Sequence, residues 1–180
     1  MLIYNTPFYI VTENFVFASI FQKLYFRNEE DCGMIRISKY FLIHGRGLSM
    51  RKILFAASEC VPFVKTGGLA DVCGALPKGF NKEEWDVRVV IPNYTCIPDK
   101  FRNNFRYITH FYMGTGTYNP GAHVGVMTYE LDGVTYYLID NLVYFGGAKP
   151  YGDFRTDIEK FAFFSKAVLE LLTVIDYEPD

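Results

Sequence analysis

The chain has 180 residues, of which 50% are hydrophobic and 21% charged, and its net charge is −2. This length is enough for one domain with a hydrophobic core, and the composition is that of a folded protein rather than a disordered one. The lack of a basic excess argues against nucleic-acid or anionic-membrane partners, and no stretch approaches the ~18 consecutive apolar residues of a membrane span.

Residues 1–49 differ in character from the rest of the chain. Their apolar runs are short and interrupted, and the first basic residue is Lys23, which does not fit a secretory signal. Our hypothesis is that Met50 is the natural start and that 1–49 is a non-native leader, with the folded domain at 50–180. The alternative is a small helical extension that packs on this domain.

The domain begins with a strand–helix–strand pattern. Residues 52–58 form a continuous apolar run, which predicts a strand buried on both faces. After a loop, helical spacing relates Leu69, Val72, Cys73, Leu76 and Phe80, and Pro77 is expected to bend or end this helix. Residues 86–92 predict a second strand, so the unit favours a parallel sheet.

The next elements are predominantly β. Residues 105–113, 124–131 and 134–139 predict strands, and Asp132-Gly133 between the last two is a strong hairpin signal. A loop rich in Tyr and Gly follows from 141 to 155.

The last element is an amphipathic helix. Thr156 and Glu159 have the spacing of a capping box, with Thr156 as the cap. The apolar stripe that should pack on the sheet consists of Ile158, Phe161, Ala162, Ser165, Val168, Leu169 and Leu172. Phe163 and Phe164 are also expected in the core. Residues 177–180 are typical of a loop that enters a strand, so we expect the chain to be truncated there.

The four cysteines have no metal-ligand or CxxC spacing. They are Cys32, Cys60, Cys73 and Cys96. Cys60 and Cys73 lie in apolar contexts and are interpreted as reduced core thiols, which favours a cytoplasmic location. We predict neither a metal nor another cofactor. His110 and His123 have no acid or nucleophile at a telling distance and are interpreted as structural.

The loop before the first helix combines a lysine with two glycines. In an open α/β sheet, ligands bind beyond the carboxyl ends of the strands, where this loop must lie. The helix N-terminus favours an anion, Gly67 and Gly68 let the backbone approach a phosphate, and Lys65 adds a full charge. A tight turn with a solvated lysine explains the pattern equally well. Neither GxGxxG nor a P-loop is present.

The segment VKTGGLADV (64–72), between SECVPF and CGALPK, resembles the N-terminal signature of the glycogen and starch synthases. Four more segments resemble the family in the same order: DVRVVIPNY (86–94), DGVTYYLIDN (132–141), PYGD (150–153) and EKFAFFSKAVLE (159–170). The resemblance covers about residues 50–180, and residues 1–49 match nothing in the family.

The resemblance implies the fold and the reaction. Members are GT-B glycosyltransferases with two Rossmann-like domains. This chain would be an incomplete Rossmann-like α/β N-terminal domain with an inserted β-hairpin region. Members of the family transfer glucose from ADP-glucose to the non-reducing end of an α-1,4-glucan such as glycogen, with retention and without a metal. The expected partners are therefore ADP-glucose and the glucan.

The resemblance also implies roles for single residues. Lys65 would contact the sugar nucleotide, and Gly67 and Gly68 would approach its diphosphate and glucose. Asp71 and Tyr151 would lie near the same pocket. A capping or solvated role for Asp71 and a packing role for Tyr151 are the alternatives.

Two further positions, Asp140 and Asn141, follow the last strand and are expected to line the cleft. No catalytic residue can be assigned from the sequence.

Two functions follow from these patterns. The first is the N-terminal portion of a glucan synthase, which by itself is expected to have little or no transferase activity. The second is a stand-alone phosphate- or glucan-binding module, in which the aromatic loop 141–151 stacks on sugar rings.

Overall fold

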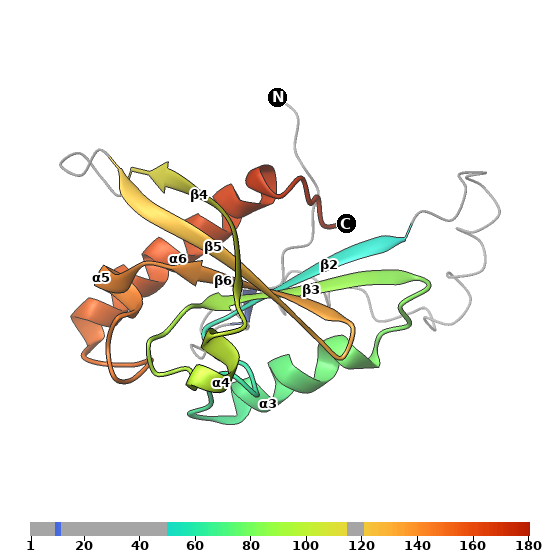
Figure 1. The fold of residues 1–180 in the computed structure, drawn as a ribbon, viewed down its shortest axis with the longest axis horizontal. Helices are drawn as coiled ribbons and strands as arrows, with labels where there is room; N and C mark the ends of the chain where they lie inside the picture. The colour runs from blue at the N-terminus through green and yellow to red at the C-terminus, as the bar shows by residue number, and fades with distance from the viewer. Residues whose placement is uncertain (1–9, 12–49, 115–120) are drawn as a thin grey trace, which may run out of the picture.

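The computed structural model describes residues 10–11, 50–114 and 121–180 (Figure 1). Within them, one six-stranded mixed sheet has the strand order β1-β2-β3-β6-β5-β4. The first four strands in this order are parallel, and β5 and β4 run antiparallel to β6 and β5, respectively. The strands are β1 (Ile10–Val11), β2 (Arg51–Ala57), β3 (Trp85–Pro92), β4 (Arg106–Met113), β5 (Ala122–Leu131) and β6 (Val134–Asp140).

This arrangement confirms the predicted α/β class. The parallel strands form the Rossmann-like part, and β4 with β5 is the inserted antiparallel region. The hypothesis of a separate leader at 1–49 lies outside the described residues, apart from β1, which pairs with the end of β2. None of the helices in the described part of the chain is long and apolar enough to cross a membrane.

The first crossover connects β2 to β3 through a short helix. Helix α3 (Gly68–Ala75) is followed by a 3₁₀ turn, Leu76–Gly79, so the helix ends just before Pro77, as predicted. The predicted apolar stripe is wrong in part, because Val72 and Leu76 are 52% and 49% exposed. With only eight residues, α3 instead packs through the small side chains of its buried face, namely Ala70, Cys73 and Gly74.

The predicted hairpin between β5 and β6 is confirmed. Asp132 and Gly133 have φ values of 53° and 71°. Both residues therefore have a left-handed backbone conformation, as the two central residues of a type I′ turn must have. This turn fixes the register in which Leu131 faces Val134.

Helix α6 (Phe154–Val174) begins three residues earlier than predicted. Asp153 is the N-cap, and its carboxylate accepts hydrogen bonds from the backbone amides of Arg155 and Thr156. The predicted capping box is therefore wrong. The Thr156 hydroxyl donates to Asp153, and Glu159 accepts from the hydroxyl of Tyr144. An aspartate was available just upstream, and its carboxylate is a strong acceptor for the free amides of the first turn.

The buried face of α6 is also rotated from the predicted stripe. Ile158 and Leu169 are more than half exposed, and only Val168 of the predicted set is fully buried. The observed core positions are Phe163, Phe164, Ala167, Val168 and Leu171, which confirms the expectation for the two phenylalanines. The cause is helix α5 (Leu142–Phe145), which no periodicity predicted. Its Tyr144 stacks on Phe163 with ring centroids 4.2 Å apart.

We predict that Gly74→Ala destabilises the domain. An added Cβ would lie 2.7 Å from the carbonyl oxygen of Val61, and this backbone atom can relax only if the loop before α3 moves. Overpacking of this kind typically costs about 1–3 kcal/mol. Urea denaturation should show the loss. Gly79→Ala is the matched control, because nothing lies within 4 Å of its added Cβ; an equal effect in both variants would contradict the packing account.

Burial makes a second prediction about the core thiols. Desolvation raises the pKa of Cys60 to about 12 and that of Cys73 to about 11. Because the thiolate is the reactive form, both should resist iodoacetamide at pH 8, whereas the exposed Cys96 should react first. Peptide mass spectrometry before and after denaturation measures this. Native labelling of Cys60 at the rate of Cys96 would contradict the buried placement.

Candidate functional site

The candidate site lies at the edge of the sheet where β2, β3 and β6 end. Because these strands are parallel, the segments that follow them meet at one edge, on the left side of Figure 1. These segments are Ser58–Gly67, Asn93–Tyr94 and Asp140–Asn141. Ligands of open α/β sheets bind at such an edge.

A buried carboxylate shapes the loop that follows β2. Glu59 is 0% exposed, and its Oε2 accepts hydrogen bonds from the amide and the hydroxyl of Thr66 at 2.5 and 2.6 Å. Its Oε1 accepts from the Gly67 amide at 3.2 Å. The sequence analysis missed this residue. The available signal was an acidic residue directly after an apolar strand, where a buried charge needs partners.

An aromatic cluster anchors the same loop to the sheet. Phe63 is 2% exposed, and its ring centroid lies 5.0 Å from that of Tyr136 on β6 and 5.3 Å from that of Phe101 on helix α4 (Asp99–Arg102). Both contacts are edge-to-face, the favoured geometry for aromatic pairs. The loop is thus held to the sheet by the packing of Phe63, and its own shape is fixed by the hydrogen bonds to Glu59.

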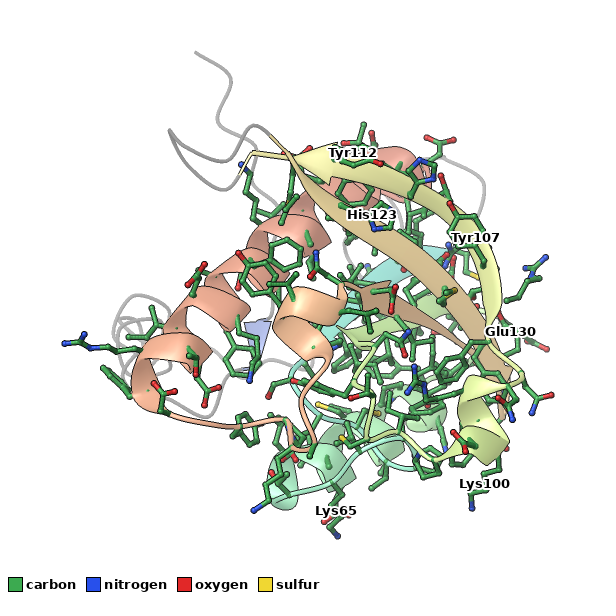
Figure 2. All side chains as sticks on the ribbon, turned by 60° about the vertical axis from the view of Figure 1, so that its left-hand side comes forward. Lys65, Lys100, Tyr107, Tyr112, His123 and Glu130 are labelled. Carbon is green, nitrogen blue, oxygen red and sulfur yellow. The ribbon has the colours of Figure 1, made fainter. Side chains whose placement is uncertain are left out.

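Lys65 lies at the open side of this loop. Its Nζ donates to both carboxylate oxygens of Asp71, each at 2.7 Å, and the side chains of the pair are 53% and 56% exposed. Figure 2 shows Lys65 beside α3, directed away from the sheet. An exposed pair of this kind contributes little to stability, so the ammonium can exchange Asp71 for an anionic ligand at small cost.

The two glycines have different roles. Gly67 is the extended N-cap of α3, and its amide is already used by Glu59. Gly68 begins the helix, whose first-turn amides have no acceptor within the helix. A Cβ added to Gly68 would meet nothing within 4 Å, so open space lies beside the helix start. The geometry therefore favours Gly68 rather than Gly67 as the position where a ligand meets free amides.

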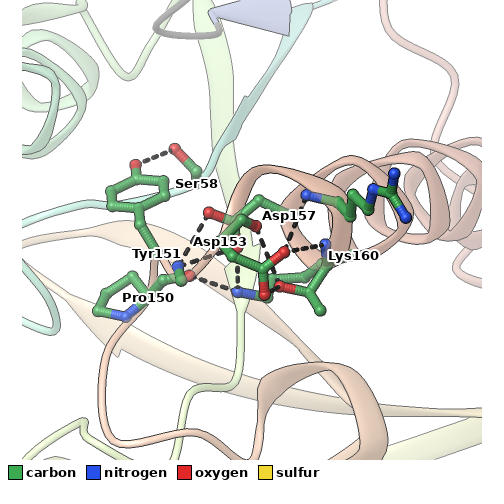
Figure 3. Close-up of polar contacts among 9 residues, drawn as sticks. Ser58, Pro150, Tyr151, Asp153, Asp157 and Lys160 are labelled. Atoms are coloured by element: carbon green, nitrogen blue, oxygen red, sulfur yellow. Dashed lines mark hydrogen bonds and ion pairs between the residues drawn. The ribbon is translucent and has the colours of Figure 1, made fainter.

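Tyr151 reaches the same edge from 93 residues further along the chain. Its hydroxyl lies 2.7 Å from the Ser58 hydroxyl, next to Glu59 (Figure 3). The ring also packs near Phe161, with centroids 5.7 Å apart. Both interpretations of Tyr151, as a site residue and as a packing residue, thus have a contact that supports them.

The loop that carries Tyr151 is held by Asp157. The Gly152 amide donates to both carboxylate oxygens of Asp157, at 3.1 and 2.9 Å (Figure 3). Lys160 donates to Asp157 and to the carbonyl of Pro150, both at 2.7 Å. This network fixes the turn before α6 and with it the position of the tyrosine.

Asp140 and Asn141 differ in their surroundings. The Asn141 side chain caps α5, accepting from the amides of Val143 and Tyr144, and donates to the carbonyl of His123 at 2.7 Å. Three of the four hydrogen bonds that its side-chain amide can make are therefore used within the protein, which limits what it can offer to a cleft. Asp140 is half-buried and accepts from Asn93 Nδ2 at 2.8 Å.

Asn93 is a further candidate that the sequence analysis missed. It directly follows β3 and is 5% exposed, and its Oδ1 has no hydrogen-bond partner among the described residues. A buried acceptor without a partner is costly, so this oxygen is suited to a ligand hydroxyl. Its position directly after a predicted strand was the available signal.

Within residues 50–114 and 121–180, no three His, Cys, Asp or Glu side chains are grouped as metal ligands would be. The site thus combines a lysine and backbone amides, which can bind an anion, with neighbouring hydroxyl and side-chain amide groups, which can form hydrogen bonds.

Comparison with known proteins identifies the family. Residues 52–180 match the family described as the starch synthase catalytic domain. The chain belongs to this family. It is 55% identical over 131 residues to the glycogen synthase of Lachnoclostridium phytofermentans and 56% identical over the same length to that of Lachnospira eligens. Each match covers 73% of this chain and 27% of the relative.

The fold agrees with a solved member of the starch synthase family. The catalytic domain of Starch Synthase IV from Arabidopsis thaliana, solved bound to ADP and acarbose, matches with a TM-score of 0.58 and 24% identity. The match covers 73% of this chain and 27% of that chain. The predicted family and the predicted fold class are therefore confirmed, and the chain spans about a quarter of the length of these relatives.

We predict that Glu59→Ala destabilises this starch synthase domain strongly. The change leaves the part-buried amides of Thr66 and Gly67 without their acceptor, and a donor left unsatisfied away from water costs up to about 1–3 kcal/mol. Thermal and urea unfolding should show the loss. Glu83→Ala, at an exposed glutamate, is the control and should stay within about 0.5 kcal/mol of wild type. Similar small effects in both variants would refute the anchoring role of Glu59.

Proposed function

We propose that the chain is the N-terminal part of a glycogen or starch synthase that transfers glucose from ADP-glucose to the non-reducing end of an α-1,4-glucan, with retention. Family membership supports the reaction class, and the names of the two bacterial relatives support glycogen as the acceptor. ADP is also the nucleotide named for the structural neighbour. The observation that carries the proposal is Lys65 beside the start of α3, at the carboxyl edge of the sheet.

In the proposed reaction, Lys65 and the first turn of α3 bind the diphosphate. Cleavage of the anomeric C–O bond leaves additional negative charge on ADP. A lysine and helix amides held in place before the reaction stabilise that charge as it develops. Asp71 then acts as the counterion that keeps Lys65 extended when the donor is absent.

The sugar end of the donor would meet the polar groups further along the same edge. The developing oxocarbenium character of glucose is favoured by nearby carboxylate and amide oxygens. We propose Asp140 and the Asn93 Oδ1 for hydroxyl contacts, and Tyr151 for a contact near the donor. The contact between Tyr151 and Ser58 supports a place beside the loop.

We propose that glucose transfer requires a protein of the relatives' full length, and that this chain by itself only binds the nucleotide. The chain spans 27% of those relatives, and a donor and an acceptor must be held together for transfer. We place the boundary of the catalytic part near residue 50, which the family match from residue 52 supports. The buried thiols of Cys60 and Cys73 support a cytoplasmic location.

We predict that Lys65→Ala weakens the binding of ADP about tenfold, because it removes a charge-assisted contact with phosphate. Titration of the ¹⁵N-labelled chain with ADP, followed by NMR, measures affinities into the millimolar range and reports which amides move.

Lys100→Ala is the matched control, since Lys100 is an exposed lysine on α4 (Figure 2). It should leave binding unchanged, and the amides that shift should include Gly68. The proposal is wrong if both variants bind ADP equally well, or if ADP perturbs no amide of residues 59–71.

A further inference from the structure

The outer strands carry a group of exposed aromatic side chains that the proposed function does not use. Tyr107, His110 and Tyr112 on β4 and His123 on β5 form this group, which we call the aromatic platform (Figure 2). All four are exposed, and the two tyrosines are 51% and 67% accessible. The sequence analysis interpreted both histidines as structural, yet neither is part of the core.

The strand register places the four rings on one face of the sheet. Tyr112 lies directly opposite His123, and His110 lies opposite Gly125, two residues further along β5. Strict alternation would put Tyr107 on the other face from His110. A bulge between Tyr107 and Thr109 adds one residue to β4, so that Tyr107 pairs with Met127 and rejoins the face of the histidines.

The rings form a broad surface rather than a compact stack. The hydroxyl of Tyr107 hydrogen-bonds to Nδ1 of His110 at 2.5 Å, while the ring centroids are 6.3 Å apart and the planes differ by 30°. That separation is about the sum of the hydrogen bond, the phenol C–O bond and the two ring radii, so these rings lie edge to edge. The ring of His123 is nearly parallel to that of His110, with centroids 5.4 Å apart and an angle of 27° between the planes.

Tyr112 borders this surface as a wall. Its ring is nearly perpendicular to those of His110 and His123, at centroid distances of 5.8 and 5.5 Å. Nearly parallel rings bordered by an upright aromatic ring are suited to a flat ligand of about one ring in width. The phenol and imidazole groups at the rim can both donate and accept hydrogen bonds.

The neighbouring residues favour a neutral, hydroxylated ligand over an anionic one. Gly125 is buried next to the platform, and an added Cβ there would lie 3.2 Å from Cβ of Asp140 and 3.4 Å from His123, so the Asp140 side chain lies beside the platform. A carboxylate beside the rings can accept hydrogen bonds from hydroxyl groups and repels phosphate. The C–H faces of a sugar ring suit aromatic faces, whose quadrupole is negative.

We propose that the aromatic platform binds an α-1,4-glucan chain at a site separate from the sugar-nucleotide loop. The choice of glucan rests on the proposed function, whereas the choice of a neutral sugar rests on the platform itself. Figure 2 shows Tyr112 and His123 at the opposite end of the molecule from Lys65. The platform would hold a glucan while the loop binds a nucleotide.

Native gel electrophoresis of the full chain, with and without glycogen in the gel, tests this inference. Wild type should be retarded by glycogen. The double variant Tyr107→Ala/Tyr112→Ala should bind at least about fivefold more weakly, because two stacking surfaces are lost. Phe154→Ala is the matched control: Phe154 is 79% exposed on α6, outside the platform, and its removal should leave the retardation unchanged.

Three further measurements separate the possible outcomes. Tyr112→Phe keeps the ring and should retain most of the binding, and a circular dichroism melt of each variant checks folding. Single Tyr112→Ala, at an exposed side chain, replaces the double variant if the latter does not fold. Titration with ADP should be unaffected in every platform variant, and Lys65→Ala should leave glycogen retardation intact.

The inference is overturned if glycogen does not retard wild type, or if it retards wild type and the platform variants alike. Loss of ADP binding in the platform variants would also overturn it, because it would indicate that the platform stacks on the adenine base of the nucleotide. The proposed nucleotide site survives the first two results, because it depends on the ADP titration of the Lys65 loop.

Discussion

The candidate site depends on one buried carboxylate. Glu59 leaves the end of β2 pointing into the protein, and it is tolerated there because the backbone and hydroxyl of Thr66 and the amide of Gly67 donate to it. These bonds close the loop on itself. They also direct Lys65, one residue earlier, to the outside, and they set the angle at which α3 begins.

The loop is rigid while its lysine is free to exchange partners. Phe63 and Glu59 are buried and make contacts on several sides, whereas Lys65 and Asp71 are half exposed. A site that binds and releases an anion requires this combination, because a preorganised backbone lowers the cost of binding and a weak ion pair is easily exchanged. The polar groups of Asn93 and Asp140 extend the same edge toward the outer strands.

The outer strands add a second chemical character to this edge. The bulge in β4 brings Tyr107 onto the face that carries His110, Tyr112 and His123, whereas an uninterrupted antiparallel pair would place it on the other face. The edge therefore has a charged loop at one end and aromatic rings at the other. In the glycogen and starch synthase reaction that we propose, the nucleotide and the glucan would be needed at the same time.

Local rules were sufficient for part of the structure. Asp132-Gly133 predicts a type I′ turn because few residue types adopt the left-handed backbone conformation that both central positions require. Pro77 predicts the end of α3 because proline lacks an amide hydrogen. Apolar runs gave the strands, and the order of elements gave the parallel sheet. Such features depend on residues next to one another, so the sequence contains all the information they require.

Tertiary structure decided the features that depend on distant partners. Tyr144 packs on Phe163, and the buried face of α6 therefore differs from the stripe that periodicity predicts. Ser58 contacts Tyr151, which lies 93 residues further along the chain. The sequence by itself identified the family segment and the lysine–diglycine loop. That Glu59 holds this loop, that Asn141 is used as a cap, and that four rings gather on one face are results of packing, because each requires side chains that only the folded sheet brings together.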